Sequence, residues 1–218
     1  MNPIKLIQNK QDPLKILCLG AHCDDIEIGL GGTLMMLTAS YSIEFVHWQV
    51  FCSDETRKIE AEKSALIYLN DIGDKIINIM DFRDGFLPYI GYNIKEKFEI
   101  IKNDFQPNLI FTHYRNDLHQ DHRLLCELTW NTFRNHLILE YEIPKYDGDL
   151  GKPNFYVEIS PELTERKIEL LHNCFKSQSN KQWFDELTFK AIMRIRGMEC
   201  AAEGGFAEAF YANKLFLE

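Results

Sequence analysis

The fold is decided by the stretch Cys18-Leu19-Gly20-Ala21-His22-Cys23-Asp24-Asp25-Ile26-Glu27. A short apolar run before it, Ile16 to Leu19, ends abruptly in one imidazole and two adjacent carboxylates, and the glycine-rich segment Gly29 to Gly32 follows. This pattern predicts a strand that delivers polar groups to the edge of a sheet. In an open α/β sheet, ligands bind in the crevice beyond the carboxyl ends of the strands, so this cluster is well placed for chemistry.

The composition is that of an ordinary globular enzyme. The chain has 218 residues, of which 45% are apolar and 26% are charged. We expect a single domain over residues 1–218, because this length is enough for one substantial core. The net charge of −9 disfavours nucleic acid and anionic membrane surfaces as partners.

The lack of a recognisable targeting signal and the spacing of the cysteines both favour a cytoplasmic protein. Residues 1–8 lack the long apolar core of a signal peptide. No apolar run approaches the roughly 20 residues of a membrane helix, so we expect no stable membrane insertion. The cysteines are widely spread without a Cys-x-x-Cys pair, which indicates reduced thiols, mostly in the core.

Strands and helices alternate along the first two thirds of the chain. The apolar runs predict strands at Lys15 to Gly20, Ile43 to Phe51, Lys75 to Met80, Leu109 to Thr112 and Asn154 to Ile159. The remaining patterns predict helices over Thr33 to Ala39, Asp54 to Asn70, Ile94 to Phe105, the residues after Arg123 to about Leu139, Pro161 to about Phe175 and Asp185 to Met198. Such alternation implies an α/β fold, a Rossmann-like three-layer sandwich with a mostly parallel central sheet. The segment from Glu203 to Phe216 has no clear assignment.

A second polar loop follows the fourth predicted strand. It supplies His119, Asp121 and His122, and it should meet the first loop because parallel strands end at one edge of the sheet. Either cluster alone could be a cap or a solvated turn, since Asp favours both. Together, two histidines and a carboxylate are a common set of ligands for a catalytic zinc with an open position for water. Of Asp24 and Asp25, one can bind the metal while the other faces the water.

Two motifs carry a resemblance to a known family. The segment from Ala21 to Gly29 resembles the Ala-His-Pro-Asp-Asp-x-Glu-x-Gly motif of the PIG-L/LmbE-like zinc deacetylases. The segment from Asp117 to Arg123 is similar to their second motif, Asp-x-His-x-Asp-His. Weaker likenesses follow in the family's usual order around Cys52, Asp84, Ser177 and Ala207. One residue departs from the pattern, because Cys23 stands where the family usually has proline.

The resemblance implies hydrolysis of the acetamide of an N-acetylated amino sugar, or of its nucleotide-, lipid- or thiol-linked conjugate. It implies one Zn²⁺ per chain, held by His22, Asp25 and His122. Zinc-bound water would attack, with Asp24 as general base and His119 as the imidazolium that stabilises the oxyanion. Asp121 would orient and charge His119.

Substrate contacts are less specific in the sequence. The candidates are Arg57, Asp84, Arg115 and His113, and for the arginines a solvent-facing position is an equal alternative. Two other functions stay open at this point. One is a metal-dependent phosphoesterase, and the other is a non-catalytic sugar-binding protein that retains the metal site. The sequence also leaves the oligomeric state open, with a homo-oligomer as one option.

Overall fold

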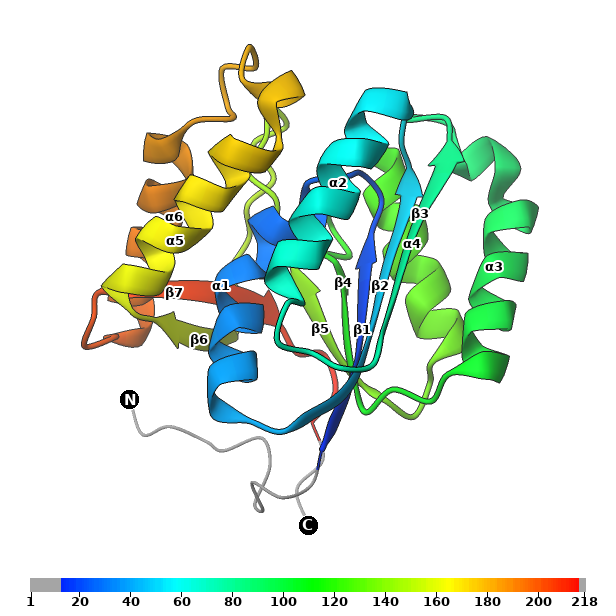
Figure 1. The fold of residues 1–218 in the computed structure, drawn as a ribbon, viewed down its shortest axis with the longest axis horizontal. Helices are drawn as coiled ribbons and strands as arrows, with labels where there is room; N and C mark the ends of the chain where they lie inside the picture. Colours follow the sequence, from blue (N-terminus) through cyan, green and yellow to red (C-terminus); the bar gives the residue numbers. More distant parts are fainter. Residues whose placement is uncertain (1–12, 216–218) are drawn as a thin grey trace.

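A computed structural model describes residues 13–215, which form one sheet flanked by helices (Figure 1). The sheet has seven strands in the order β3-β2-β1-β4-β5-β7-β6. The strands are β1 (Leu14–Gly20), β2 (Ile43–Cys52), β3 (Lys75–Phe82), β4 (Leu109–His113), β5 (Leu137–Tyr141), β6 (Phe155–Ile159) and β7 (Phe206–Tyr211). The amino-terminal stretch, for which the sequence predicts no signal peptide, lies outside the described residues.

The helices cover both faces of the sheet. They are α1 (Asp25–Ser40), α2 (Glu55–Tyr68), α3 (Gly91–Asp104), α4 (Gln120–Thr132), α5 (Pro161–Cys174) and α6 (Glu186–Cys200), with short 3-10 turns η1 (Leu87–Ile90) and η2 (Lys176–Gln178). Helices α1, α2, α5 and α6 lie on one side, and α3 packs with α4 on the other (Figure 1). Among the described helices, none combines the length and apolar character needed to cross a membrane.

The predicted fold class is confirmed. Strands β1 to β5 pair in parallel, whereas β7 runs antiparallel to both β5 and β6. Strand β1 lies between β2 and β4, and it is buried along its length apart from Lys15. This explains its continuous apolar run, because a central parallel strand is covered on both faces. The loops that follow β1 and β4 therefore leave neighbouring strands at one edge of the sheet.

The predicted start of the first helix is wrong. The sequence pattern predicts a glycine-rich loop and then a helix from Thr33, but α1 begins at Asp25 and runs through the glycines. The reason is close packing. A Cβ on Gly29 would lie 2.2 Å from the ring of Tyr141, so glycine lets α1 rest directly on β5. The two carboxylates of the first motif consequently stand at the amino end of a helix.

The second half of the chain contains two further differences. The helix predicted to reach Leu139 ends at Thr132, and the next apolar run forms β5. The segment without an assignment contains β7, which enters the sheet between β5 and β6. An apolar run of five or six residues fits a strand as well as a helix, and only its pairing in the sheet decides between them.

A buried ion pair joins three of these elements. Nζ of Lys167 on α5 lies 2.6 Å from Oε1 of Glu208 on β7 and donates to the carbonyl of Ile28 on α1. The Glu208 carboxylate also accepts the backbone N–H groups of Gly32 and Thr33. Both charged side chains are at most 3% exposed. The pair therefore fixes α1, whose first turn carries the motif, against α5 and β7.

Replacing Lys167 by methionine should lower the free energy of unfolding by about 3–5 kcal/mol, because Glu208 would keep a buried charge without its cation. Urea unfolding measures this quantity. The matched control is Lys190→Met, which removes an exposed pair with Glu165 and should cost no more than about 1 kcal/mol. Equal losses in the two variants would contradict the assigned role of the buried pair.

Candidate active site

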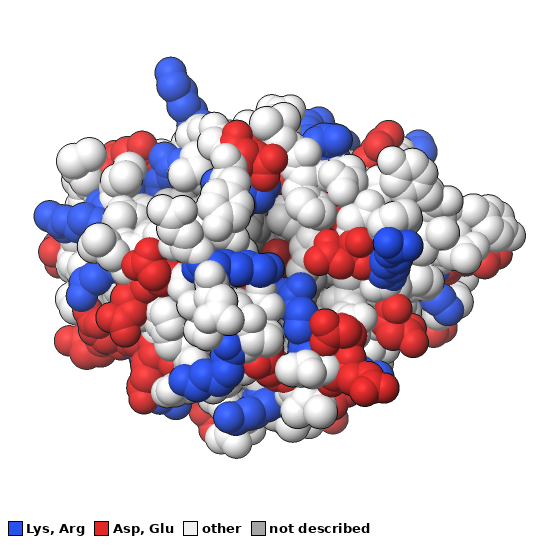
Figure 2. Space-filling model, turned by 90° about the horizontal axis from the view of Figure 1, so that it is seen from above, with Lys and Arg blue, Asp and Glu red and all other residues white. Residues whose placement is uncertain are grey.

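The two motif loops converge above the ends of β1 and β4. His22 lies in the loop after β1, and Asp25 is the first residue of α1. His119 caps the amino end of α4, and His122 lies in that helix's first turn. Seen from this edge of the sheet, the surface is hollowed near its centre, with acidic atoms in the hollow and lysine or arginine side chains beside it (Figure 2).

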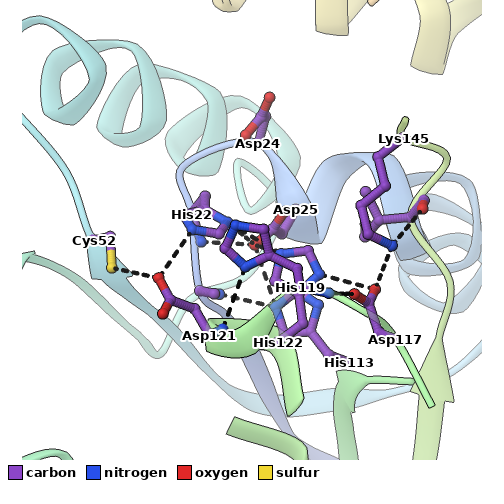
Figure 3. Close-up of polar contacts among 12 residues, drawn as sticks. His22, Asp24, Asp25, Cys52, His113, Asp117, His119, Asp121, His122 and Lys145 are labelled. Carbon is purple, nitrogen blue, oxygen red and sulfur yellow. Dashed lines mark hydrogen bonds and ion pairs between the residues drawn. The ribbon is translucent and has the colours of Figure 1, made fainter. Parts of the chain in front are cut away.

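The three side chains predicted as metal ligands point at one another (Figure 3). Nδ1 of His22 lies 3.1 Å from Nε2 of His122 and 3.3 Å from Oδ2 of Asp25. The same Asp25 oxygen is 3.5 Å from Nε2 of His122. In a tetrahedral zinc site with bonds of about 2.0–2.1 Å, ligand atoms are about 3.3 Å apart. The donor set and its spacing therefore fit one such ion.

A carboxylate behind His122 fixes the ring in the orientation that a metal ligand needs. Oδ2 of Asp117 lies 2.9 Å from Nδ1 of His122 and 2.9 Å from Nζ of Lys145. Lys145 also reaches Asp149, which accepts the backbone N–H of Leu118. With Nδ1 bonded to a carboxylate, the lone pair of His122 faces the cluster through Nε2. Lys145 has no predicted role, because no sequence pattern marks one lysine in a long loop.

His113 lies beneath this cluster and is not open to a substrate. It is fully buried and stacks on His122 with ring centroids 3.9 Å apart. Its Nε2 lies 3.2 Å from the Asp25 carboxylate and 2.9 Å from the backbone nitrogen of Ala21. The sequence predicts His113 as a substrate contact, but the structure buries this side chain fully beneath Asp25. It supports Asp25 from below instead, because β4 extends one residue further than predicted.

The contacts of His119 and Asp121 differ from those implied by the resemblance. The Asp121 carboxylate accepts backbone N–H groups from Gly85 and Leu87 and shows no hydrogen bond to the His119 ring within the described part of the chain. The ring of His119 accepts the backbone N–H of Asp121 at Nδ1, as a helix cap. A neutral ring in this arrangement carries its proton on Nε2. Asp121 therefore anchors the loop after β3, and without a hydrogen bond to the ring its charge only partly offsets the burial that lowers the pKa of His119.

Asp24 and two predicted substrate contacts form a group beside the cluster. Nη2 of Arg57 lies 2.7 Å from Oδ1 of Asp24, while Oδ2 of Asp24 is buried without a hydrogen-bond partner. Figure 3 shows the Asp24 carboxylate apart from the histidines and turned away from them. Asp84 is 58% exposed, and its carboxylate lies 3.0 Å from Nε2 of His22 and 3.9 Å from Arg57.

Arg115 is not brought to this group. Its guanidinium lies 3.3 Å from the Glu140 carboxylate and over the ring of Trp130 on α4. The backbone N–H of Arg115 also bonds to Glu140. Arg115 therefore contacts side chains of α4 and β5. Its side chain is half-exposed and lies outside the metal-ligand cluster.

Two cysteines lie near the cluster in different ways. Sγ of Cys23 donates to the backbone carbonyl of Cys52 at 3.4 Å, and burial raises the pKa of the Cys23 thiol to about 12. Sγ of Cys52 lies 4.0 Å from Oδ2 of Asp121. Groups of three ligand atoms within 4.8 Å of one another occur at His22, His119 and His122, at Asp25, His113 and His122, and at His22, Cys52 and Asp121. The thiol in such a group is that of Cys52. The sequence instead singles out Cys23, the residue that departs from the family motif.

Charges within the cluster shift several pKa values in opposite directions. Burial opposes ionisation of Asp25, but His122, His113 and His22 outweigh it and hold the pKa of Asp25 well below its usual range. Burial would lower the pKa of His22, but the neighbouring carboxylates raise it well above 6.5. Burial and then the charge of His113 lower the pKa of His122 to about 3. The cluster therefore holds its positive charge on His22 when no metal is bound.

Asp24 and His119 are shifted toward their neutral forms. Burial raises the pKa of Asp24, and the Arg57 charge offsets this effect only in part. Burial and then the charge of His22 lower the pKa of His119 below 6.5. When no metal is bound, both shifts favour the neutral form, whereas the resemblance implies an imidazolium at His119.

Comparisons with known proteins agree with this geometry. Residues 17–133 match the profile of the family described as PIG-L: GlcNAc-PI de-N-acetylase. The diacetylchitobiose deacetylase of Thermococcus kodakarensis is 31% identical over 121 residues, which are 49% of this chain and 43% of that protein. The aligned region is therefore less than half of that relative.

Solved structures show the same fold. The conserved protein TT1542 from Thermus thermophilus has a TM-score of 0.74 at 19% identity, covering 94% of this chain and 97% of that one. The N,N'-diacetylchitobiose deacetylase from Pyrococcus horikoshii, complexed with its inhibitor MPG, has a TM-score of 0.69 at 23% identity, covering 92% and 84%.

In the metal-free protein at neutral pH, we expect His22 to carry protons on both ring nitrogens and His122 to be neutral. The raised pKa of His22 keeps it charged as the pH rises past 6.5, and the pKa of His122 near 3 keeps it neutral as the pH falls. Ring nitrogen shifts from two-bond ¹H–¹⁵N correlation spectra, recorded between about pH 5 and pH 8, distinguish these states. Common titration of both rings near 6.5 would contradict this charge distribution.

Proposed function

This chain belongs to the PIG-L (GlcNAc-PI de-N-acetylase) family, and on that premise we propose that it is a zinc-dependent hydrolase of N-acetylated amino sugars. Its substrate would be the free sugar or a nucleotide-, lipid- or thiol-linked conjugate. The observation that carries the proposal is the meeting of three donor atoms, from His22, Asp25 and His122, at separations of 3.1–3.5 Å. We also propose that residues 1–218 act as one domain.

His22, Asp25 and His122 would hold one zinc ion through the atoms that already face one another. A bound zinc ion would polarise an acetamide carbonyl and lower the pKa of water toward about 7. Asp117 would keep Nε2 of His122 directed at the ion, with Lys145 holding Asp117 in place. Loss of such a supporting carboxylate typically weakens metal binding about 10–100-fold.

Asp24 is the proposed general base. Hydrolysis breaks the acetamide C–N bond, forms a C–O bond to the attacking water, and moves one proton from that water to the leaving amine. Oδ2 of Asp24 has no hydrogen-bond partner and could take and return that proton, while Oδ1 is paired with Arg57. Because the carboxylate is turned toward Arg57, this role requires Asp24 to rotate toward the three ligand atoms.

His119 is the proposed oxyanion donor, acting as a neutral ring. Its Nδ1 accepts the backbone N–H of Asp121, so Nε2–H remains to donate to the tetrahedral oxyanion. One such donor typically accounts for about 2.7–4 kcal/mol of transition-state stabilisation. Of the predicted substrate contacts, Arg57 and Asp84 border this region and would bind sugar hydroxyls.

Neither alternative function is favoured. The family match and the deacetylase relative support amide hydrolysis over phosphoester hydrolysis. A non-catalytic binding protein would need neither Asp24 nor His119. All the cysteines are free thiols, which supports the proposed cytoplasmic location, where disulfides are rare.

The decisive experiment measures acetate release from a panel of N-acetylamino sugars, supplied free, as glycosides and as nucleotide conjugates. With one equivalent of zinc, we expect one acetate and one free amine per molecule hydrolysed, with activity lost on chelation and restored by zinc. A phosphate monoester in the same panel tests the alternative enzyme class. Phosphate release without acetate release would contradict the proposal.

Asp24→Asn should reduce kcat by about 10²–10⁴-fold, because asparagine cannot take the proton from water. Zinc content should stay at one ion per chain, since Asp24 is not among the proposed ligands. The control is Asp54→Asn, the same exchange at the exposed cap of α2, which should keep full activity. Near-normal turnover of the zinc-loaded Asp24→Asn enzyme would remove Asp24 from the role of base.

A further inference from the structure

A second group of ligand atoms lies on the other side of the His22 ring. Nδ1 of His22 faces Asp25 and His122, whereas Nε2 faces the loop after β3 and the start of α4 (Figure 3). Nε2 lies 3.0 Å from Oδ1 of Asp84 and 3.5 Å from Oδ2 of Asp121. The same Asp121 oxygen is 4.0 Å from Sγ of Cys52, the last residue of β2.

Burial distinguishes this group from a chance meeting of surface side chains. His22 is 7% exposed, Cys52 is 1% exposed and Asp121 is fully buried. Nε2 of His22 is aimed into the group but has no hydrogen bond of suitable geometry, although both carboxylates are close. A buried ring nitrogen that meets carboxylates only in poorly aligned contacts is incompletely satisfied, which indicates that a cation between these groups would fit better.

The donor types indicate which ligand fits. One imidazole, one thiol and two carboxylates can surround a single tetrahedral ion. The ligand atoms of His22, Cys52 and Asp121 all lie within 4.8 Å of one another, with His22 to Asp121 at 3.5 Å and Asp121 to Cys52 at 4.0 Å. Asp84 adds a carboxylate oxygen 3.0 Å from Nε2 of His22. The longest separation involves sulfur, whose bonds to zinc are about 2.3 Å, longer than bonds to nitrogen or oxygen. A thiolate favours thiophilic ions such as Zn²⁺ or Co²⁺ over Mg²⁺ or Ca²⁺.

We propose that His22, Cys52, Asp84 and Asp121 form a second metal site for a thiophilic divalent cation. The ion binds Sγ of Cys52, Nε2 of His22 and one oxygen of each aspartate. The thiol proton and the Nε2 proton of His22 leave to solvent, so the imidazolate bridges this ion and the one on Nδ1. Because His22 serves both sites, the second ion binds after the first, at excess metal.

Occupancy of the second site has a functional consequence, which rests on the proposed function. Asp84 would be withdrawn from the substrate side, and Asp121 would be drawn away from the backbone N–H groups that hold the loop after β3. The second ion would therefore inhibit the deacetylase. Metal binding itself does not depend on that activity and is tested separately.

Cobalt titration of the metal-free, full-length protein reports on the second site directly. Co²⁺ bound to histidine and aspartate gives only weak visible bands, whereas a thiolate ligand adds an intense near-ultraviolet charge-transfer band. We expect the first equivalent to give the visible bands alone and the second to add the charge-transfer band. A titration that reaches excess Co²⁺ without this band overturns the proposal.

Variants assign the band to one sulfur. Cys52→Ser should bind the first equivalent and lose the charge-transfer band, while Cys23→Ser, at the neighbouring thiol outside the group, should keep it. Should Cys52→Ser fail to fold, Asp84→Asn at a half-exposed position gives a second test. It should weaken binding of the second ion at least about tenfold. A band that persists in Cys52→Ser, or unchanged binding in Asp84→Asn, contradicts the assignment.

Activity measurements separate this proposal from the proposed function. Zinc beyond one equivalent should inhibit acetate release by the unaltered enzyme, and Cys52→Ser should show no further loss at excess zinc relative to one equivalent. If no acetate is released at any zinc concentration, the proposed function fails while the cobalt band still decides the second site. If acetate release continues undiminished with two zinc ions bound per chain, inhibition by this site is refuted.

Discussion

The site depends on one buried carboxylate, that of Asp25. Its Oδ2 lies 3.2–3.5 Å from a nitrogen of His22, His113 and His122, and it accepts the backbone N–H of His22. A carboxylate this far from water needs compensating charge and hydrogen bonds. Since the three histidines come from the loop after β1, from β4 and from α4, the same negative charge joins both motif loops. A proton on His22 or a metal ion can supply the balancing positive charge at this point.

Loops without recognisable motifs hold the motif side chains in place. The loop after β5 brings Lys145 against Asp117, and the loop after β3 offers two backbone N–H groups to Asp121. These loops also leave the carboxyl ends of parallel strands, so the sheet gathers four loops around one centre. The precision of the ligand geometry thus comes from segments in which the sequence marks neither Lys145 nor the backbone N–H groups of Gly85 and Leu87.

The sequence correctly predicted the features of the fold that depend on local apolar patterns and on motif spacing. The alternation of apolar runs was enough for the parallel sheet, and the adjacency of β1 and β4 follows from a Rossmann-like strand order. The prediction failed where tertiary contacts decide. The glycines of α1 looked like a loop because their close approach to Tyr141 is invisible in one dimension. The burial of His113 and the pairing of Arg115 with Glu140 depend on neighbouring strands in the same way. Cys52 carried only a weak likeness to the family and no sign of a ligand role, since a thiol at a strand end is usually part of the core.

The balance of charge explains why this edge of the sheet attracts cations. Within the described residues, the side-chain contacts of the cluster include two permanent cations, Arg57 and Lys145. They face six carboxylates, those of Asp24, Asp25, Asp84, Asp117, Asp121 and Asp149. Burial raises the pKa of Asp24, which the Arg57 charge offsets in part, and the raised pKa of His22 adds one positive charge. The remaining negative charge lies on both sides of the His22 ring, toward Asp25 and toward Asp84 and Asp121. A divalent ion on the Nδ1 side neutralises the first group and leaves the second unbalanced, which is the electrostatic reason for a second cation on the Nε2 side.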